Sequence, residues 1–358
     1  MGSLLLYIGT FITSTFFITL AEINDKKNVK RLFSIVGLLI PIIMFGLRYN
    51  VGADYESYIN LYNKYCNATL NYLIFTRKFE IGFSLVMKIA YIFKCPQLIF
   101  IAFSTSTLII LYRNIANNKE KCSISLAWFL VLFLYSASTL NIIRQMLAVA
   151  IVMNSYKYVW ERRPIRFFIT VLLATMFHIT ALLFLPCYFI NYKNNSKKQK
   201  ILRMGIILIV LLIVIFFNNF MGILTGIDSF ERYKGYTKNI ESNNYKFLVK
   251  LLVLGAIIPF RKRLYQYNEK NKLYYFLLII DVILYATGFI SPFIKRITLY
   301  FGISEIFIIS QIPRVLKKQS EKNTTILVII GYAISMFIIT AYILGQSGII
   351  PYQTIIGR

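Results

Sequence analysis

Charged and aromatic side chains crowd one short stretch, residues 48–58, directly after an apolar run that ends at Leu47. The stretch contains Arg48, Asp54 and Tyr58, and Gly52 permits a tight turn between them. Arginine recognises phosphate through paired N–H groups, whereas tyrosine rings suit membrane interfaces and the faces of sugars. We therefore expect contacts to a phosphate and a sugar here; a salt bridge that only fixes the loop is the alternative.

Three more polar groups lie next to or within apolar segments: Glu80, the pair Arg144-Gln145, and His178, the chain's one histidine. An arginine in hydrocarbon is costly, so Arg144 either reaches the head groups or holds a phosphate. His178 is either a hydrogen-bonded core residue or a functional group that donates to a diphosphate or exchanges a proton with a hydroxyl. Glu80 complements the positive end of a helix or faces the same outer cavity as Asp54.

Two later stretches add cations. Arg232 and Tyr233 lie in a polar segment of mixed charge, which resembles a substrate-binding lid or a solvated connector. Arg296 follows a break at Ser291-Pro292. Asp281, inside an apolar run, needs a partner, for which Lys295 or Arg296 is a candidate. This set of side chains suits an anionic, lipid-linked group at the outer leaflet.

Several kinds of chemistry are excluded by the residues present. The four cysteines form no CxxC pair, and one histidine cannot complete a metal cluster, so we expect no metal and no cofactor. The sequence also has no P-loop and no serine nucleophile elbow.

These residues must be positioned by membrane helices. The chain is 58% hydrophobic with a mean hydropathy of +0.64, which predicts an all-α polytopic membrane protein built from spans of about 20 apolar residues. We expect one transmembrane domain over residues 1–358, with outer loops at about 48–80 and 218–245. The clear apolar runs are residues 4–20, 32–47, 97–112, 125–140, 142–159, 201–217, 247–260, 273–290, 297–312 and 325–344.

Two further apolar segments, residues 81–93 and 167–190, make the total ten to twelve spans. Both cross the membrane or neither does, because otherwise the later loops would invert. Lysine and arginine favour cytoplasmic loops, and this bias favours ten spans. Residues 81–94 are then an interfacial helix whose lysines, Lys88 and Lys94, extend to the head groups, and residues 167–190 form a re-entrant hairpin with its tip near His178.

The formal net charge of +26 falls mainly in short loops between the apolar runs. This pattern indicates orientation and contact with anionic lipids rather than nucleic-acid binding. The basic loop at residues 26–31 is predicted to be cytoplasmic, which leaves the N-terminus and the loop with Arg48 outside.

The order of several motifs resembles the EpsG family, integral membrane proteins of exopolysaccharide and capsule clusters allied to Wzy-type polymerases. The motifs are Arg48-Tyr49-Asn50-Val51-Gly52-Ala53-Asp54-Tyr55 with Tyr58, Glu80-Ile81-Gly82-Phe83, Ile143-Arg144-Gln145, Phe177-His178-Ile179-Thr180-Ala181 and Pro351-Tyr352. After residue 200 the likeness rests on Arg296 and the Pro-Tyr pair.

The resemblance implies a lipid-glycosyltransferase (GT-C-like) membrane fold in the bacterial cytoplasmic membrane, with the active site facing outward. It implies metal-independent, inverting polymerisation of oligosaccharide repeats carried on undecaprenyl diphosphate, with a chain-length regulator and a flippase as candidate partners. Arg144, Arg296 and Arg48 would then stabilise the diphosphate, with Tyr58, Gln145, Arg232 and Tyr233 as further substrate contacts. Asp54, Glu80 and His178 remain rival candidates for the base.

Other readings differ in the acceptor or in the class of protein. An O-antigen-type ligase or another lipid-linked glycosyltransferase would share the donor and the fold. A flippase of lipid-linked oligosaccharides would be expected to show repeated halves, and this sequence shows none. A membrane-bound O-acyltransferase would also use one intramembrane histidine, but the richest polar loop here is far from His178 in the sequence.

Overall fold

The computed structural model describes residues 1–76, 79–190, 196–215, 245–286 and 296–356. The regular elements in these ranges are helices, as the sequence predicts, and the chain is an all-α polytopic membrane protein. It divides into two compact units. The first comprises residues 1–151, 173–179 and 316–358, and the second residues 152–172 and 180–315.

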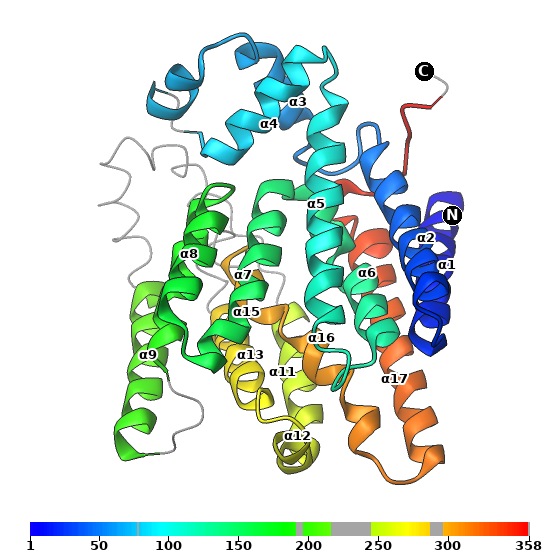
Figure 1. Ribbon diagram of the computed structural model, residues 1–358, viewed down its shortest axis with the longest axis vertical. Coiled ribbons are helices and arrows are strands. Elements are labelled where there is room, and N and C mark those ends of the chain that lie inside the picture. The colour runs from blue at the N-terminus through cyan, green and yellow to red at the C-terminus, as the bar shows by residue number, and fades with distance from the viewer. Residues whose placement is uncertain (77–78, 191–195, 216–244, 287–295, 357–358) are drawn as a thin grey trace. The chain divides into compact units, whose positions relative to one another are not determined.

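Five long helices build the first unit and are apolar enough to cross a membrane. They are α1 (Gly2–Ile23), α2 (Lys27–Gly46), α5 (Gln97–Ala116), α6 (Ile124–Asn141) and α17 (Gln319–Phe337), which continues as η6 (Ile338–Ile343). Helix α1 packs on α2, α2 on α5, and α6 receives α1, α5 and α17 (Figure 1). These spans confirm five of the apolar runs predicted from hydropathy.

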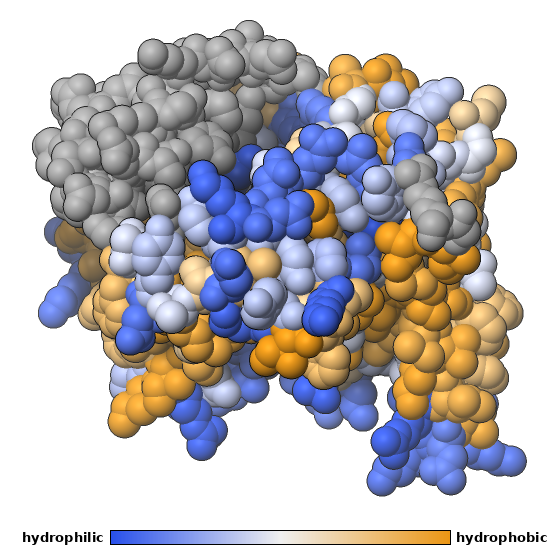
Figure 2. Space-filling model, turned by 90° about the horizontal axis from the view of Figure 1, so that it is seen from above, coloured by the Kyte–Doolittle hydropathy of each residue, from blue (hydrophilic) through white to orange (hydrophobic). Residues whose placement is uncertain are grey.

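The interior of this bundle is rich in aromatic rings, and its flank is apolar. The buried ring of Phe11 contacts the rings of Tyr7, Phe45, Phe133 and Phe337. Exposed apolar side chains of α1 and α2 include Leu5, Leu6, Ile12, Phe16, Leu32, Ile35, Leu39 and Ile43. Figure 2 shows hydrophobic side chains over much of the right-hand side of the view, the side on which α1 and α2 lie in Figure 1, as expected where helix flanks meet lipid.

Short helices follow α2 in the first unit: α3 (Tyr55–Tyr65), η1 (Tyr72–Thr76) and α4 (Ile81–Ile92). At 1.5 Å per residue, α4 extends about 18 Å, too short for a span of about 30 Å. Its length agrees with the ten-span reading. The prediction for Lys88 was wrong, because its ammonium donates to the carbonyls of Cys66 and Ala68 at 2.9 and 2.8 Å instead of extending to head groups.

The segment around His178 is a helical hairpin, as predicted. Helix α7 (Ile143–Glu161) is followed by α8 (Pro164–Thr175), a turn, and the 3₁₀ segment η2 (Ile179–Phe189). At the base, Arg162 donates to the carbonyls of Tyr188 and Ile190, and the Phe167 and Tyr188 ring centroids are 5.0 Å apart. The turn contains His178. Its depth in the membrane stays a prediction.

The second unit is arranged around α13 (Asn271–Ala286), which contacts α9, α11, α15 and α16. The unit contains α9 (Lys197–Ile215), α11 (Tyr245–Ile257), η4 (Ile258–Phe260), α12 (Arg261–Tyr267), α15 (Leu299–Gly302), α16 (Glu305–Ile309) and η5 (Ile312–Val315). The run predicted as one span at 297–312 is thus a series of short helical pieces.

Asp281 has a cationic partner, as the sequence requires, but the residue is Lys250 and lies far from Arg296 in the sequence. The Lys250 ammonium is 3.2 Å from Asp281 and 2.8 Å from Glu305. Both carboxylates are almost completely buried, which explains why they share a cation. Gly302 packs directly on Asp281, where a Cβ would lie 2.7 Å from the carboxylate.

Candidate active site

Glu80 lies between Arg144 and His178 in the first unit. Arg144 donates to Glu80 Oε2 at 2.7 Å, and His178 Nδ1 lies 3.8 Å from Glu80 Oε1. The side chain of Glu80 is 7% exposed, whereas Arg144 and His178 are 23% and 15% exposed. The carboxylate is therefore enclosed, and the guanidinium and imidazole are the members that a substrate can reach.

Three interruptions in helical structure bring these side chains together. Glu80 has an extended backbone directly before α4, and Arg144 is the second residue of α7. His178 occupies the turn after α8, where its N–H donates to the Ala174 carbonyl at 3.1 Å. The Gly82 N–H donates to the Met176 carbonyl at 2.7 Å, which ties the start of α4 to this turn.

Only glycine fits this contact without rearrangement. A Cβ on Gly82 would lie 2.5 Å from the Phe177 ring and 2.8 Å from the Met176 carbonyl oxygen. The ring of Phe177 is held in turn, edge-on, by Phe103 at 6.0 Å between centroids. Glu80 and His178 are therefore positioned by the backbone on both sides of the contact.

The guanidinium of Arg144 packs against two aromatic rings. Its guanidinium carbon is 4.8 Å from the Phe83 ring centroid and 5.7 Å from that of Tyr58. Cation–π contact and the Glu80 hydrogen bond fix the plane of the group. A guanidinium has five N–H donors, so Arg144 can hold Glu80 and also contact a phosphate.

Arg48 has a different place from the one expected for a substrate contact. Its side chain is fully buried and donates to the carbonyls of Phe45, Val51 and Leu140 and to Ser104 Oγ. Burial lowers the pKa of Arg48 to about 10, so the group remains charged at neutral pH. The proposed site does not include it, because its N–H groups stabilise the protein's own backbone.

The loop with Arg48 is fastened to the junction of α6 and α7, just ahead of Arg144. Gly52 has φ +101°, and a Cβ there would lie 2.6 Å from the Leu140 carbonyl oxygen. The Asp54 N–H donates to Asn141 Oδ1 at 2.8 Å. Arg48 also donates to the Leu140 carbonyl. The loop with Arg48 therefore fixes the break between α6 and α7, directly before Arg144.

The C-terminal residues support the same loop, a role that the sequence analysis did not predict. The Tyr49 N–H donates to the Gln353 carbonyl at 2.9 Å, and Arg48 and Thr354 form an isolated β-bridge. The Tyr352 hydroxyl donates to the Met44 carbonyl at 2.8 Å. The Pro-Tyr pair was the available signal, but its position in the sequence does not indicate which segment it contacts.

The remaining candidates lie in different places. Tyr58 and Gln145 are buried beside Arg144, in α3 and α7, and Asp54 is half-buried at the start of α3. Arg296 is half-buried in the second unit, and Arg232 and Tyr233 lie outside the described residues.

The sequence model of the EpsG family matches residues 30–354, nearly the whole chain. The chain belongs to the EpsG family. No curated protein and no solved structure matches it. EpsG proteins are glycosyltransferase-like membrane proteins of the polysaccharide-polymerase type, and the matched residues include Glu80, Arg144 and His178. The family resemblance inferred from the sequence motifs is confirmed.

Proposed function

We propose that this EpsG-family protein joins oligosaccharide repeats carried on undecaprenyl diphosphate, at the outer face of the bacterial cytoplasmic membrane. The observation that carries the proposal is the enclosed Glu80 carboxylate between Arg144 and His178. The arrangement supplies a cation for a diphosphate and an imidazole for a hydroxyl proton, which are the two needs of this transfer.

In the proposed reaction, a sugar hydroxyl of the incoming repeat attacks the anomeric carbon of the growing chain. A new glycosidic C–O bond forms as the bond from the anomeric carbon to the diphosphate oxygen breaks. The diphosphate leaves with the electron pair, and attack from the opposite face inverts the anomeric centre. The hydroxyl proton passes to His178, and the products are a longer lipid-linked glycan and undecaprenyl diphosphate.

Each residue of the cluster has a separate role in this proposal. Arg144 stabilises the charge that develops on the departing diphosphate. His178 is the base, and Glu80 is a positioning residue that orients both the guanidinium and the imidazole, as a third group does in nucleophile–base arrangements. Hydrogen bonds between catalytic groups are often long before substrate binds and shorten in the complex, so the 3.8 Å separation between His178 Nδ1 and Glu80 Oε1 is compatible with this role.

The other candidate residues are proposed to bind or position the substrates rather than to take part in bond making. Asp54 lies at the start of α3, directly after the loop of residues 48–53 (the motif loop), and is proposed to position the acceptor. Tyr58 and Gln145, both buried, are proposed to hold Arg144 in position. Arg296, Arg232 and Tyr233 are proposed diphosphate or glycan contacts, each to be tested by its own variant.

Reconstitution of the purified protein with a lipid-linked repeat tests the function. A ladder of products that each differ by one repeat is the expected result. Transfer to a different acceptor without a ladder would indicate a ligase, and movement of the repeat across the bilayer without any transfer would indicate a flippase. Either of these results would contradict the proposal.

A further inference from the structure

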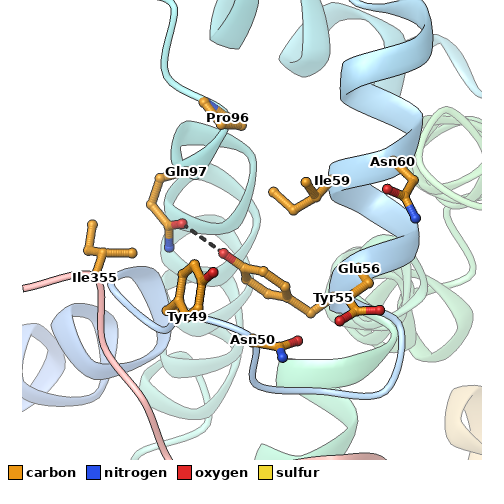
Figure 3. Close-up of a pocket in the computed structure, with 9 residues that line it drawn as sticks. All are labelled: Tyr49, Asn50, Tyr55, Glu56, Ile59, Asn60, Pro96, Gln97 and Ile355. Atoms are coloured by element: carbon orange, nitrogen blue, oxygen red, sulfur yellow. Dashed lines mark hydrogen bonds between the residues drawn. The ribbon is translucent and has the colours of Figure 1, made fainter. Parts of the chain in front are cut away.

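The first unit contains a pocket of about 530 Å³ at the start of α3 (Figure 3). The volume falls in the range of roughly 300–1,000 Å³ that is usual for small-molecule sites. Its walls come from the motif loop, α3, the start of α5 and the C-terminal segment at Ile355. None of the cluster residues Glu80, Arg144 and His178 lines it, so it is a separate site.

Two tyrosines line the pocket, and Tyr55 is the more buried of them at 6% exposed. Tyr55 is stacked on Phe100 with centroids 4.3 Å apart and planes 9° apart, and its hydroxyl donates to Gln97 Oε1 at 3.3 Å. Tyr49 meets Tyr55 at 6.1 Å and is 38% exposed. Figure 3 shows the two rings beside each other below Gln97, with Ile59 pointing toward the space between α3 and Gln97.

The polar groups around these rings are amides and a carboxylate. Gln97 Nε2 donates to the Gly46 and Arg48 carbonyls, so the amide is fixed, and Asn50, Glu56 and Asn60 are exposed. Among the described residues that line the pocket, none is cationic, although the chain has a net charge of +26. This lining does not suit a diphosphate.

Aromatic faces bordered by amide and carboxylate acceptors match a sugar ring, whose C–H face is apolar and whose hydroxyls donate hydrogen bonds. The pocket also shares one set of rings with the proposed active site. Tyr55 stacks on Phe100, Phe100 meets Tyr58 at 6.2 Å, and Arg144 lies over Tyr58.

We propose that this pocket binds a sugar residue of the glycan, away from the diphosphate, through Tyr49, Tyr55 and Glu56. The assignment rests on the proposed function, because that function supplies a glycan. Two glycans share the same chemistry: the incoming repeat and the growing chain.

Binding of a lipid-free glycan tests the pocket independently of catalysis. The probe is the host's repeat oligosaccharide, released from its lipid, with glycans of one repeat and of several repeats as separate arms. The full-length protein in nanodiscs should bind it, and Glu56→Gln and Tyr49→Ala should each weaken binding about tenfold. Glu321→Gln and Tyr72→Ala are matched controls, since Glu321 is exposed and Tyr72 is 37% exposed against 38% for Tyr49.

The outcomes separate the two glycans and the two proposals. Weaker binding of one repeat with a higher KM would assign the pocket to the acceptor, whereas weaker binding of longer glycans with shorter products would assign it to the growing chain. Unchanged affinity for both glycans in Glu56→Gln and Tyr49→Ala would overturn the pocket assignment, even if the wild type forms a ladder. Absence of transfer by the wild type, with glycan binding intact, would contradict the proposed function alone.

Discussion

The backbone N–H of Gly82 donates a 2.7 Å hydrogen bond to the carbonyl of Met176, two residues ahead of His178. This contact joins the start of α4, where Glu80 lies, to the turn after α8. The geometry of the Glu80–His178 pair thus depends on a close backbone approach, which a side chain at residue 82 would prevent.

Gly82→Ala should therefore reduce activity by displacing His178 from Glu80. The added Cβ would lie 2.5 Å from the Phe177 ring and 2.8 Å from a backbone oxygen, and overpacking of this kind costs about 1–3 kcal/mol. Gly9→Ala, in α1, is the matched control because its Cβ would meet nothing within 4 Å. Transfer rate and thermal stability would be measured for both; a fully active Gly82→Ala would refute the positioning role.

His178→Gln should slow transfer by about 100-fold or more, because glutamine cannot take up the hydroxyl proton. Asp54→Asn should slow it less and mainly raise the KM for the acceptor repeat. The two rate constants, measured at saturating donor, decide between these residues. If Asp54→Asn shows the greater loss in maximum rate, the base is assigned wrongly.

Arg48→Ala should destabilise the protein, whereas loss of a side chain that only contacts substrate would leave stability unchanged. Three buried carbonyls, those of Phe45, Val51 and Leu140, would lose a donor. Each such loss costs about 1–3 kcal/mol. The temperature of half-unfolding of the purified protein is the measurement, with Arg163→Ala as the control, since Arg163 is 50% exposed. Normal stability with impaired diphosphate binding would return Arg48 to the substrate contacts.

The ten-span topology predicts that the loops after α5 and α7 are cytoplasmic. Lys119 lies in the first of these loops, Glu161 is the last residue of α7, and both are exposed. In a background with Cys66, Cys95, Cys122 and Cys187 replaced by serine, Lys119→Cys and Glu161→Cys should react with an impermeant thiol reagent only after the membrane is opened. Labelling of either in intact cells would favour the twelve-span arrangement.

Residue types identified the members of the candidate site, but they did not show which of the candidates lie together. Glu80, Arg144 and His178 are polar groups next to or within apolar segments, and such groups are costly in hydrocarbon. They are far apart in the sequence, and only the breaks before α4, before α7 and after α8 place them together. Gly82 is the one sign in the sequence of this close packing, but a glycine alone does not identify the segment that it contacts.

The sequence analysis assigned Arg48 to phosphate and Lys88 to lipid head groups, whereas both side chains bind backbone carbonyls in the structure. An arginine at a helix end has the same sequence context whether it binds phosphate or backbone carbonyls, and burial decides between them. Lys88 was expected at the head groups, yet two carbonyls of the preceding loop lie within its reach. Hydropathy likewise identified residues 297–312 as apolar without showing that they divide into α15, α16 and η5.

The most direct test of the account is the rate of glycan transfer by Arg144→Ala, reconstituted with a purified lipid-linked repeat. We predict a loss of about 100- to 1,000-fold in transfer rate, since removal of a group that stabilises developing charge has this effect. The protein should remain in the membrane, with a thermal stability that is lowered because the enclosed Glu80 carboxylate loses its cationic partner. A ladder of normal length formed at the wild-type rate by Arg144→Ala would contradict the central claim.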